Sequence, residues 1–298
     1  MTQDQHTQTD PSTQYRPTEE QSGDKIPHPG PTDAMPQKPD HGEDSYAGSG
    51  KLTGKKAVIT GGDSGIGRAV AIAFAREGAD VLIVYLPEEQ KDAEETISWV
   101  EKAGQKGIAL PGDIRDESFC KEIVSTAVSE LGGIDVLVNN AAYQMSIDSF
   151  SELTTEQFQR TFTTNVFAMF WITQAALPHL QPGATIINTS SVQAYQPTPA
   201  LIDYACTKAA ILNFTRALSQ EVAPKGIRVN TVAPGPIWTP LIPATMPEEQ
   251  VAEFGAETPM GRAGQPAELA PAYVFLASQE SSYITGERIG VTGGMPTP

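Results

Sequence analysis

Short apolar runs alternate with longer amphipathic segments from about residue 56 to residue 291. The apolar runs, each long enough for one buried strand, lie at residues 56–60, 81–85, 106–110, 135–138, 185–189, 228–233 and 288–291. The segments between them place apolar side chains at helical spacing, at residues 68–76, 88–103, 116–131, from about 155 onward, 203–222 and 266–276. A strand, a helix and another strand in regular succession form the unit of a parallel sheet. The pattern therefore predicts an α/β fold with a parallel sheet.

One segment late in the chain departs from this alternation. Residues 241–262 mix apolar and polar positions with neither period, directly after a proline-rich turn at residues 234–240. A segment of this kind beside the carboxyl ends of the strands is typical of a loop that covers a binding site. We expect residues 241–262 to form a lid that sets the choice of substrate.

The first 50 residues differ from the rest in composition. They contain nine acidic and three basic residues, a net charge of −6, with frequent Pro, Gln, Thr and Gly and almost no apolar periodicity. Such a segment cannot bury enough apolar surface to offset the entropy lost on ordering. We therefore predict a disordered acidic tail at residues 1–50, dispensable for catalysis, and one catalytic domain at residues 51–298.

The whole chain of 298 residues carries 36 acidic and 20 basic residues, a net charge of −16. An acidic surface argues against nucleic acid and anionic membrane as partners. No early apolar run has the form of a signal peptide, and none reaches the roughly 18 residues of a membrane-spanning helix. The protein is therefore predicted to be cytoplasmic. The two cysteines, Cys120 and Cys206, are too few for a metal cluster.

A glycine-rich loop follows the first apolar run. Residues 60–67 read Thr-Gly-Gly-Asp-Ser-Gly-Ile-Gly, between a predicted strand and a predicted helix. Glycines let the backbone approach a pyrophosphate closely, and the helix amino terminus presents unpaired N–H groups to the anion. An ordinary turn can also be glycine-rich, but the strand before it and the helix after it favour dinucleotide binding. The candidate contacts are Gly61, Asp63, Ser64, Gly65, Ile66 and Gly67.

A tyrosine and a lysine begin the helical segment at residues 203–222. Tyr204 and Lys208 are four residues apart, so on a helix they share one face. A nearby cation favours the phenolate of a Tyr, whose unperturbed pKa is about 10. Ser191 follows the fifth apolar run, where open α/β sheets bind ligands, and its hydroxyl can hold a carbonyl oxygen. Alone, a Tyr/Lys pair at this spacing more often marks an exposed helix face, so its context has to decide.

Other polar residues near strand ends and on helices admit two interpretations each. Asp113 is placed either to bond an adenine edge or to cap the following helix. Asn165, within an aromatic helical segment, is either a satisfied core amide or a group that reaches the site through water. Thr239 either contacts a phosphate or amide of a ligand or only closes a stiff turn. Asn140 and Ala141 end the fourth run, where small residues would admit a cofactor.

Taken in order, these motifs resemble those of the short-chain dehydrogenase/reductase family. The matching positions are Thr60-Gly-x-x-x-Gly-Ile-Gly67, Asn139-Asn-Ala141, Asn165, Ser191 and Tyr204-x-x-x-Lys208. The resemblance covers residues 52–298. The first 50 residues, the glycine loop and the turn at residues 232–241 are closer still to a bacterial subgroup described as general-stress or glucose/ribitol-dehydrogenase-like oxidoreductases. Two departures are Ala142, where the family usually has Gly, and Val291-Thr292, where an apolar residue and Asp are usual.

The resemblance implies a fold, a reaction and an assembly. The fold would be a Rossmann-type, doubly wound parallel sheet of seven strands in a single domain. The reaction would be hydride transfer between NAD(P)(H) and a small alcohol or carbonyl compound such as a sugar, polyol, aldehyde or ketone. The assembly would be a homotetramer. The alternative is a redox-sensing regulator that binds the dinucleotide on the same fold, although such proteins typically lose the tyrosine that is present here.

The resemblance also implies roles for individual residues. Tyr204 would be the acid and base, Lys208 would lower its pKa and bind the nicotinamide ribose, and Ser191 would orient the substrate oxygen. Asn165 would hold a water of a proton relay. Beyond the glycine loop, the implied cofactor contacts are Tyr85, Asp113, Ile114, Asn140, Ala141, Tyr204, Lys208, Pro234, Gly235, Ile237 and Thr239.

Signals for the choice between NAD(H) and NADP(H) conflict. Ser64 stands where NADP-using members often carry a basic residue, and Glu88 and Glu89 would repel a 2′-phosphate. Tyr85, however, stands where an NAD-using member usually has the Asp that bonds the ribose hydroxyls. On balance the sequence favours NAD(H).

Overall fold

Seven parallel strands form one sheet in the order β3-β2-β1-β4-β5-β6-β7. The computed structural model describes residues 4–15 and 22–297. The strands are β1 (Lys56–Thr60), β2 (Asp80–Tyr85), β3 (Gly107–Pro111), β4 (Ile134–Asn139), β5 (Leu180–Thr189), β6 (Arg228–Pro234) and β7 (Arg288–Val291). The strand order reverses direction between β1 and β4, which opens a crevice at the carboxyl ends of these strands. The predicted doubly wound, seven-stranded parallel sheet is confirmed.

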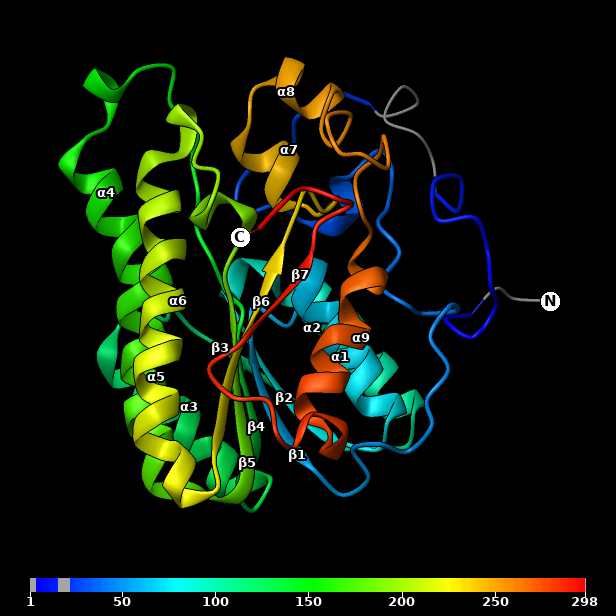
Figure 1. Ribbon diagram of the computed structural model, residues 1–298, viewed down its shortest axis with the longest axis vertical. Coiled ribbons are helices and arrows are strands. Elements are labelled where there is room, and N and C mark those ends of the chain that lie inside the picture. The colour runs from blue at the N-terminus through cyan, green and yellow to red at the C-terminus, as the bar shows by residue number, and fades with distance from the viewer. Residues whose placement is uncertain (1–3, 16–21, 298) are drawn as a thin grey trace.

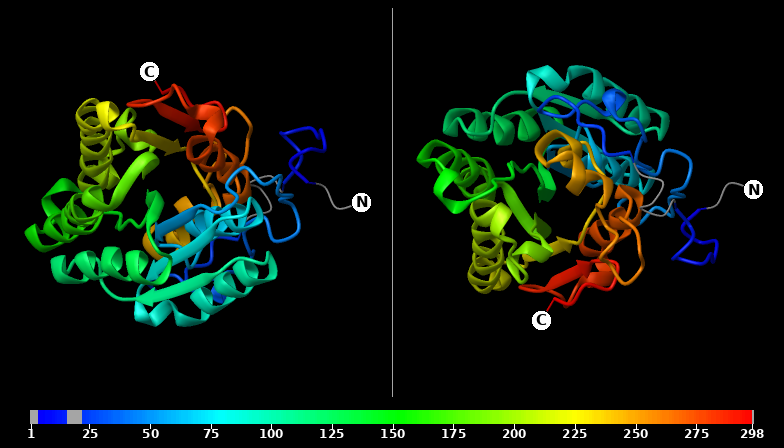
Figure 2. Two further views of the ribbon diagram at one scale, coloured as in Figure 1. Left: turned by 90° about the horizontal axis from the view of Figure 1, so that it is seen from below. Right: turned by 90° about the horizontal axis from the view of Figure 1, so that it is seen from above.

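Helices cover both faces of the sheet (Figure 1, Figure 2). One face carries α1 (Gly65–Arg76), α2 (Gln90–Lys102) and α9 (Pro266–Ala277). The other carries α3 (Glu117–Glu130), α4 (Thr155–Phe162), α5 (Ala168–Ala176) and α6 (Ile202–Val222). Two short helices, α7 (Leu241–Thr245) and α8 (Glu248–Ala252), lie beyond the carboxyl edge of the sheet. They form the first half of the predicted lid.

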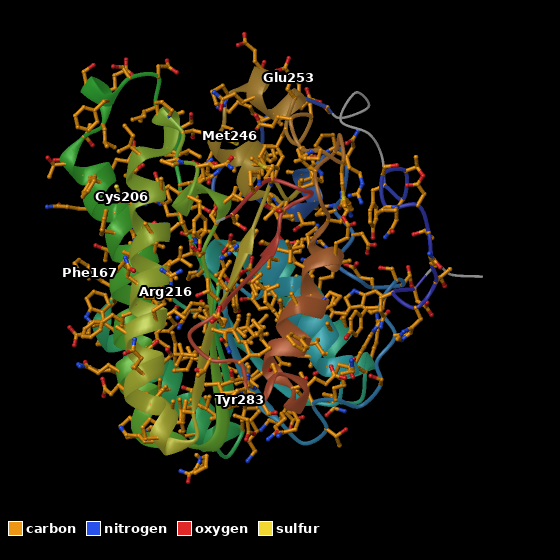
Figure 3. The ribbon with its side chains drawn as sticks, viewed as in Figure 1. Phe167, Cys206, Arg216, Met246, Glu253 and Tyr283 are labelled. Atoms are coloured by element: carbon orange, nitrogen blue, oxygen red, sulfur yellow. The ribbon has the colours of Figure 1, made fainter. Side chains whose placement is uncertain are left out.

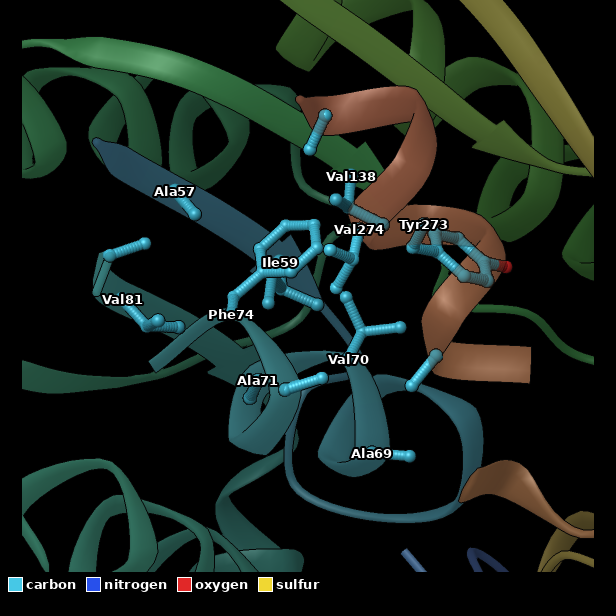
Figure 4. Close-up of a cluster of buried hydrophobic side chains, with 14 of the residues drawn as sticks. Ala57, Ile59, Ala69, Val70, Ala71, Phe74, Val81, Val138, Tyr273 and Val274 are labelled. Carbon is cyan, nitrogen blue, oxygen red and sulfur yellow. The ribbon is translucent and has the colours of Figure 1, made fainter. Parts of the chain in front are cut away.

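Side-chain alternation along the strands divides the core into two layers. In β1, Ala57 and Ile59 point to the α1 side, whereas Val58 points to the α3 side. Because both faces of a parallel sheet are covered, the central strands carry apolar side chains on both faces, which is why they read as nearly continuous apolar runs. Figure 4 shows the α1 layer, where Phe74 of α1 and Val274 of α9 meet the sheet.

The amino-terminal segment is placed differently from the sequence-based expectation. Residues 1–3 and 16–21 of the predicted disordered tail lie outside the described residues. Residues 22–50, however, lie against the domain, with Ile26, Met35 and Tyr46 buried. The pattern missed this because these apolar side chains are far apart in sequence and follow no period, and polar and main-chain hydrogen bonds hold the rest of the segment. The division of the chain at residue 50 stays a prediction.

Within residues 4–15 and 22–297, no helix combines the length and the apolar character required to cross a bilayer.

Candidate active site

The glycine loop turns sharply between β1 and α1 at the crevice. Gly65 has a φ of 49°, in the left-handed region that favours glycine. A Cβ at Gly67 would lie 1.8 Å from the carbonyl oxygen of Gly61, so only glycine fits there. Ser64 precedes α1 without a side-chain cap, which leaves the first N–H groups of the helix available to an anion. The loop therefore fits the pyrophosphate of a dinucleotide.

Asn140 fixes the glycine loop to the end of β4. Its side-chain amide donates to the carbonyl oxygens of Thr60 and Gly61, at 3.1 and 3.2 Å. The Thr60 hydroxyl accepts from the main-chain N–H groups of Asn140 and Ala141, at 3.0 and 3.1 Å. These contacts hold two loops from neighbouring strands in register, so Asn140 shapes the floor of the cleft.

Tyr204 and Lys208 lie on one face of α6, one turn apart. The Lys208 ammonium is 5.2 Å from the centroid of the Tyr204 ring, and it donates to the carbonyl oxygen of Thr189 at 2.9 Å. The Ser190 hydroxyl donates to the Lys208 carbonyl oxygen at 2.8 Å, which ties α6 to the end of β5. The Ser191 hydroxyl lies near enough to the phenol of Tyr204 to act on its pKa. Two hydroxyl groups and a buried amino group thus meet at one wall of the cleft.

Burial controls the protonation states of Tyr204 and Lys208. Loss of solvent raises the pKa of Tyr204 to about 12, against which the hydrogen bond from Ser191 acts in the lowering direction. Burial also lowers the pKa of Lys208, which is 2% exposed, to about 7. Desolvation, and not the neighbouring Lys208, therefore determines the direction of the Tyr204 pKa shift, whereas the sequence-based expectation was a lowering by Lys208. At neutral pH Tyr204 holds its proton.

Asn165 lies in a π-helical turn, Thr163–Phe167, between α4 and α5. Its side-chain oxygen accepts from the main-chain N–H of Tyr143 at 2.7 Å. Its amide donates to the Tyr143 carbonyl oxygen at 2.9 Å and to the Thr207 hydroxyl at 3.0 Å. Every contact of the side chain thus joins the loop after β4 to α6, behind the cleft wall. Of the two interpretations, the structure supports a satisfied buried amide that positions its neighbours.

Asp113 lines the cleft and does not cap α3. Its carboxylate accepts from the guanidinium of Arg115, which lowers the pKa of Asp113. The cap of α3 is Asp116, whose side chain accepts from the N–H of Ser118 at 2.8 Å. The helix-capping interpretation of Asp113 is therefore wrong.

The corner of the cleft beside β2 is acidic. Asp63 is buried, and its Oδ2 atom has no hydrogen-bond partner among the described residues. Burial, together with the charge of Asp92, raises the pKa of Asp63 to about 6. Burial and the charge of Asp63 raise the pKa of Glu89 to about 8. Arg68 offsets part of this negative charge, because its guanidinium donates to Asp92 at 2.8 Å.

These groups line one continuous cleft of about 600 Å³. Its lining includes all the predicted site residues except Gly67 and Asn165. The predicted residues in the lining are Gly61, Asp63, Ser64, Gly65, Ile66, Tyr85, Asp113, Ile114, Asn140, Ala141, Ser191, Tyr204, Lys208, Pro234, Gly235, Ile237 and Thr239. Such a volume, with a glycine cradle at one end and an unpartnered carboxylate oxygen at one corner, fits a dinucleotide.

Sequence reasoning missed several residues of the cleft. His28 and Pro29, from the amino-terminal segment, line it, and so do Arg115 and Arg160. Arg115 stands two residues after Asp113, a signal that could have been noticed. Nothing in the sequence marks His28, because its neighbours in the fold are far away along the chain.

Known proteins resemble this chain over most of its length. Residues 61–296 match the family model described as Enoyl-(Acyl carrier protein) reductase. The Escherichia coli (strain K12) protein named uncharacterized oxidoreductase YghA is 57% identical over 286 residues, which are 96% of this chain and 97% of that protein.

Two plant relatives carry more specific names. The Arabidopsis thaliana protein named NADPH-dependent aldehyde reductase 1, chloroplastic, is 48% identical and covers 89% of this chain and 94% of its own. The Daucus carota protein named glucose and ribitol dehydrogenase is 46% identical, over 94% of this chain and 97% of its own.

A solved structure shares the fold. The crystal structure of a short chain dehydrogenase from Burkholderia cenocepacia J2315 in complex with NADP has a TM-score of 0.77 and 32% identity. It covers 82% of this chain and 98% of that chain.

Proposed function

The chain belongs to the short-chain dehydrogenase/reductase family of NAD(P)-dependent oxidoreductases, and from that premise we propose that it interconverts an alcohol and a carbonyl, with Tyr204 as acid and base. The observation that carries the proposal is the meeting of Ser191, Tyr204 and Lys208 at one wall of a cleft that also contains the glycine loop. A sugar, polyol, aldehyde or ketone is the proposed substrate. The names of the aldehyde reductase and of the glucose and ribitol dehydrogenase support this class.

The proposed chemistry follows from the protonation state of the Tyr204 phenol. The dinucleotide, when bound, supplies or accepts the hydride. In the direction of reduction, the phenol of Tyr204 donates its proton to the substrate oxygen, which the Ser191 hydroxyl holds in place. The Lys208 ammonium stabilises the phenolate left behind. A Tyr204 pKa of about 12 means that the residue begins in the state that reduction requires. Oxidation uses the same groups in reverse and needs the phenolate.

Asn165 is proposed to support this wall from behind. Its side chain is engaged with Tyr143 and Thr207, so a relay water would have to be held by its main-chain carbonyl. The π-helical turn at Asn165 supports such a role, because these turns concentrate at functional sites.

The proposed preference between the two dinucleotides depends on Glu89. The sequence favours NAD(H), whereas the names of one relative and two solved neighbours refer to NADPH or NADP. Once Glu89 is ionised, the acidic corner that it forms with Asp63 would repel a 2′-phosphate and favour NAD(H). Below its pKa of about 8, Glu89 is largely neutral and the repulsion is weaker.

We further propose a cytoplasmic homotetramer. Phe158 of α4, Phe167 of the π-helical turn and Phe170 of α5 are exposed, and Figure 3 shows Phe167 on the outer side of this layer. A row of exposed aromatic side chains fits a surface that a second copy of the chain covers. Sedimentation analysis of the wild type and of Phe167→Ser tests this assembly.

An activity screen tests the proposed reaction. Purified protein is mixed with NADH or NADPH and a panel of sugars, aldehydes and ketones, and with NAD or NADP and the matching alcohols and polyols. Dinucleotide-dependent turnover of at least one carbonyl/alcohol pair is expected. Tight dinucleotide binding without turnover of any pair would instead favour a redox-sensing regulator, a reading that the enzyme names of the relatives do not support.

A further inference from the structure

The amino-terminal segment spans two parts of the molecule that border the cleft. The main-chain N–H of Ile26 donates to the carbonyl oxygen of Pro243 in α7 at 3.3 Å. The main-chain N–H of Thr32 donates to Asp92 of α2 at 2.9 Å. Between these two anchors, His28 and Pro29 line the cleft. The segment thus passes from the lid to the helix beside the acidic corner, and one edge of the cleft wall is built from it.

A small apolar cluster joins the segment to the lid. Ile26 and Met35, 7% and 4% exposed, pack with Trp238, Ile242 and residues of the lid. The indole N–H of Trp238 donates to the carbonyl oxygen of Gln37 at 2.8 Å. The segment supplies two of the seven buried members of this cluster, so the lid has no complete core without it.

Further along, the segment is held on the α1 face of the domain. The Arg76 guanidinium donates to the carbonyl oxygens of Gly42, Glu43 and Tyr46. The Tyr46 hydroxyl donates to Glu77 at 2.7 Å. In Figure 1 the blue segment runs past α7 and α8 and returns along α9 and α1. The part of the segment that passes the cleft, residues 26–32, is therefore attached to the domain on both sides.

His28 brings the segment to two arginines of the cleft. The His28 and Tyr143 rings meet edge to face with centroids 5.7 Å apart, and the Arg160 guanidinium lies 4.1 Å from the centroid of Tyr143. Partial burial, with the nearby charges of Arg160 and Arg115, lowers the pKa of His28. Asp113, predicted to contact adenine, is paired with Arg115. Residues 26–32 therefore pass beside the adenosine half of the predicted dinucleotide site.

We propose that residues 22–50 form a strap that holds the lid and completes the dinucleotide cleft, with His28 as its cofactor-facing residue. Dinucleotide exchange then requires the strap to open between Ile26 and Thr32. The inference rests on the proposed function, since it takes the dinucleotide as the ligand. It replaces the expectation that the tail is dispensable, because a truncation of residues 1–48 would remove one edge of the cleft and part of the core of the lid.

Trypsin cleavage after Lys25 reports on the strap. Lys25 is exposed, but Ile26 is buried and its N–H donates to the Pro243 carbonyl oxygen, so cleavage requires local opening.

Met35→Asp places a carboxylate in the apolar cluster, and its burial is unfavourable enough to release the strap. Asp33→Asn is the matched control, because Asp33 is exposed in the strap and pairs with Lys91 at the surface. Cleavage of the dinucleotide-free protein should be at least tenfold faster in Met35→Asp and unchanged in the control.

Release of NADH and NADPH, followed by fluorescence after dilution into excess NAD or NADP, measures the effect on exchange. Met35→Asp should release either dinucleotide at least tenfold faster than the wild type, and both should slow wild-type cleavage after Lys25. His28→Ala, which leaves the apolar cluster intact, should release them two- to fivefold faster with an unchanged unfolding midpoint. Release rates within twofold of the wild-type rate in both variants would overturn the proposal that the strap controls dinucleotide exchange. Failure of the wild type to bind either dinucleotide would overturn the proposed function itself.

Discussion

The catalytic wall and the lid border the same cleft but are built in different ways. Tyr204 and Lys208 stand on α6, a helix of 21 residues that packs along the core, and their positions are fixed by bonds to the end of β5. The lid contains two helices of five residues each. Its core is the small cluster shared with the strap. Figure 3 places Met246 and Glu253 of the lid beyond the edge of the sheet.

This difference separates two requirements of the proposed reaction. Proton transfer needs groups held within a fraction of an ångström, which a buried sheet and a long helix provide. Ligand exchange needs an element that opens at low free energy, and segments with few buried apolar contacts open most readily. Changes in the wall should therefore act on chemistry or global stability, whereas changes in the lid and strap should act on local opening.

The largest effect is expected from Tyr204→Phe. Phenylalanine keeps the ring in place but removes the proton donor, so kcat should fall by about 10²- to 10⁴-fold. Dinucleotide affinity and the unfolding midpoint should stay near those of the wild type. Steady-state kinetics, fluorescence titration and urea unfolding measure the three quantities. Near-normal turnover would show that Tyr204 is not the acid and base.

A core substitution should separate the two regions by stability. Phe74→Ala removes a fully buried ring between α1 and the sheet and should lower the free energy of unfolding by about 3–5 kcal/mol. Ile242→Ala in the lid should lower the global value much less, because the lid can open without the sheet. Urea denaturation followed by circular dichroism compares the two. Equal losses would mean that the lid and the sheet unfold as one cooperative unit.

The same contrast explains how much the sequence could predict. Strands β1 and β7 were predicted at their observed limits, because a short, largely apolar run is the usual sequence pattern of a strand in a parallel sheet. The Tyr204/Lys208 pair was placed on one helix face because helical spacing is local. The strap was missed, because Ile26 and Met35 are nine residues apart, follow no period, and contact a lid that lies more than 200 residues later in the chain.

Asn165 illustrates a second limit. The sequence reads as one continuous helix from residue 155, and no residue type in it signals a π-helical turn. The pKa of Tyr204 could not be predicted either, since the spacing to Lys208 gives the partner but not the degree of burial, and burial proves to be the larger effect.

Glu89→Gln tests whether the acidic corner controls dinucleotide choice. In the wild type, the pKa of Glu89, about 8, means that its negative charge appears as the pH rises from 7 to 9. Over this range a 2′-phosphate is already ionised. The ratio of kcat/KM for NADPH to that for NADH should therefore fall roughly tenfold in the wild type and stay nearly flat in Glu89→Gln. A ratio that falls equally in both proteins would assign the effect to another group.

Glu89→Gln should also change how the free energy of unfolding depends on pH. Because the folded-state pKa of Glu89 is raised above its ordinary value of 4.5, the folded protein holds a proton that the unfolded chain loses first. The stability contributed by this group is complete below pH 4.5 and declines as the pH rises toward about 8. Glu89→Gln should accordingly weaken the decline of unfolding free energy across this interval, measured by urea unfolding at several pH values.

The smallest predicted effect is confined to the lid and strap. Trp238→Phe keeps an aromatic ring in the apolar cluster but removes the indole N–H that donates to the Gln37 carbonyl oxygen at 2.8 Å. Loss of one such hydrogen bond costs about 1 kcal/mol, which corresponds to roughly fivefold in an opening equilibrium. Trypsin cleavage after Lys25 should be faster by about that factor, while kcat for the chemical step stays unchanged. Tyr283→Phe, fully exposed and remote from the strap, is the control. Cleavage as slow as in the wild type would mean that the Trp238 bond does not limit opening, and that the apolar packing of Ile26 and Met35 alone holds the strap on the lid.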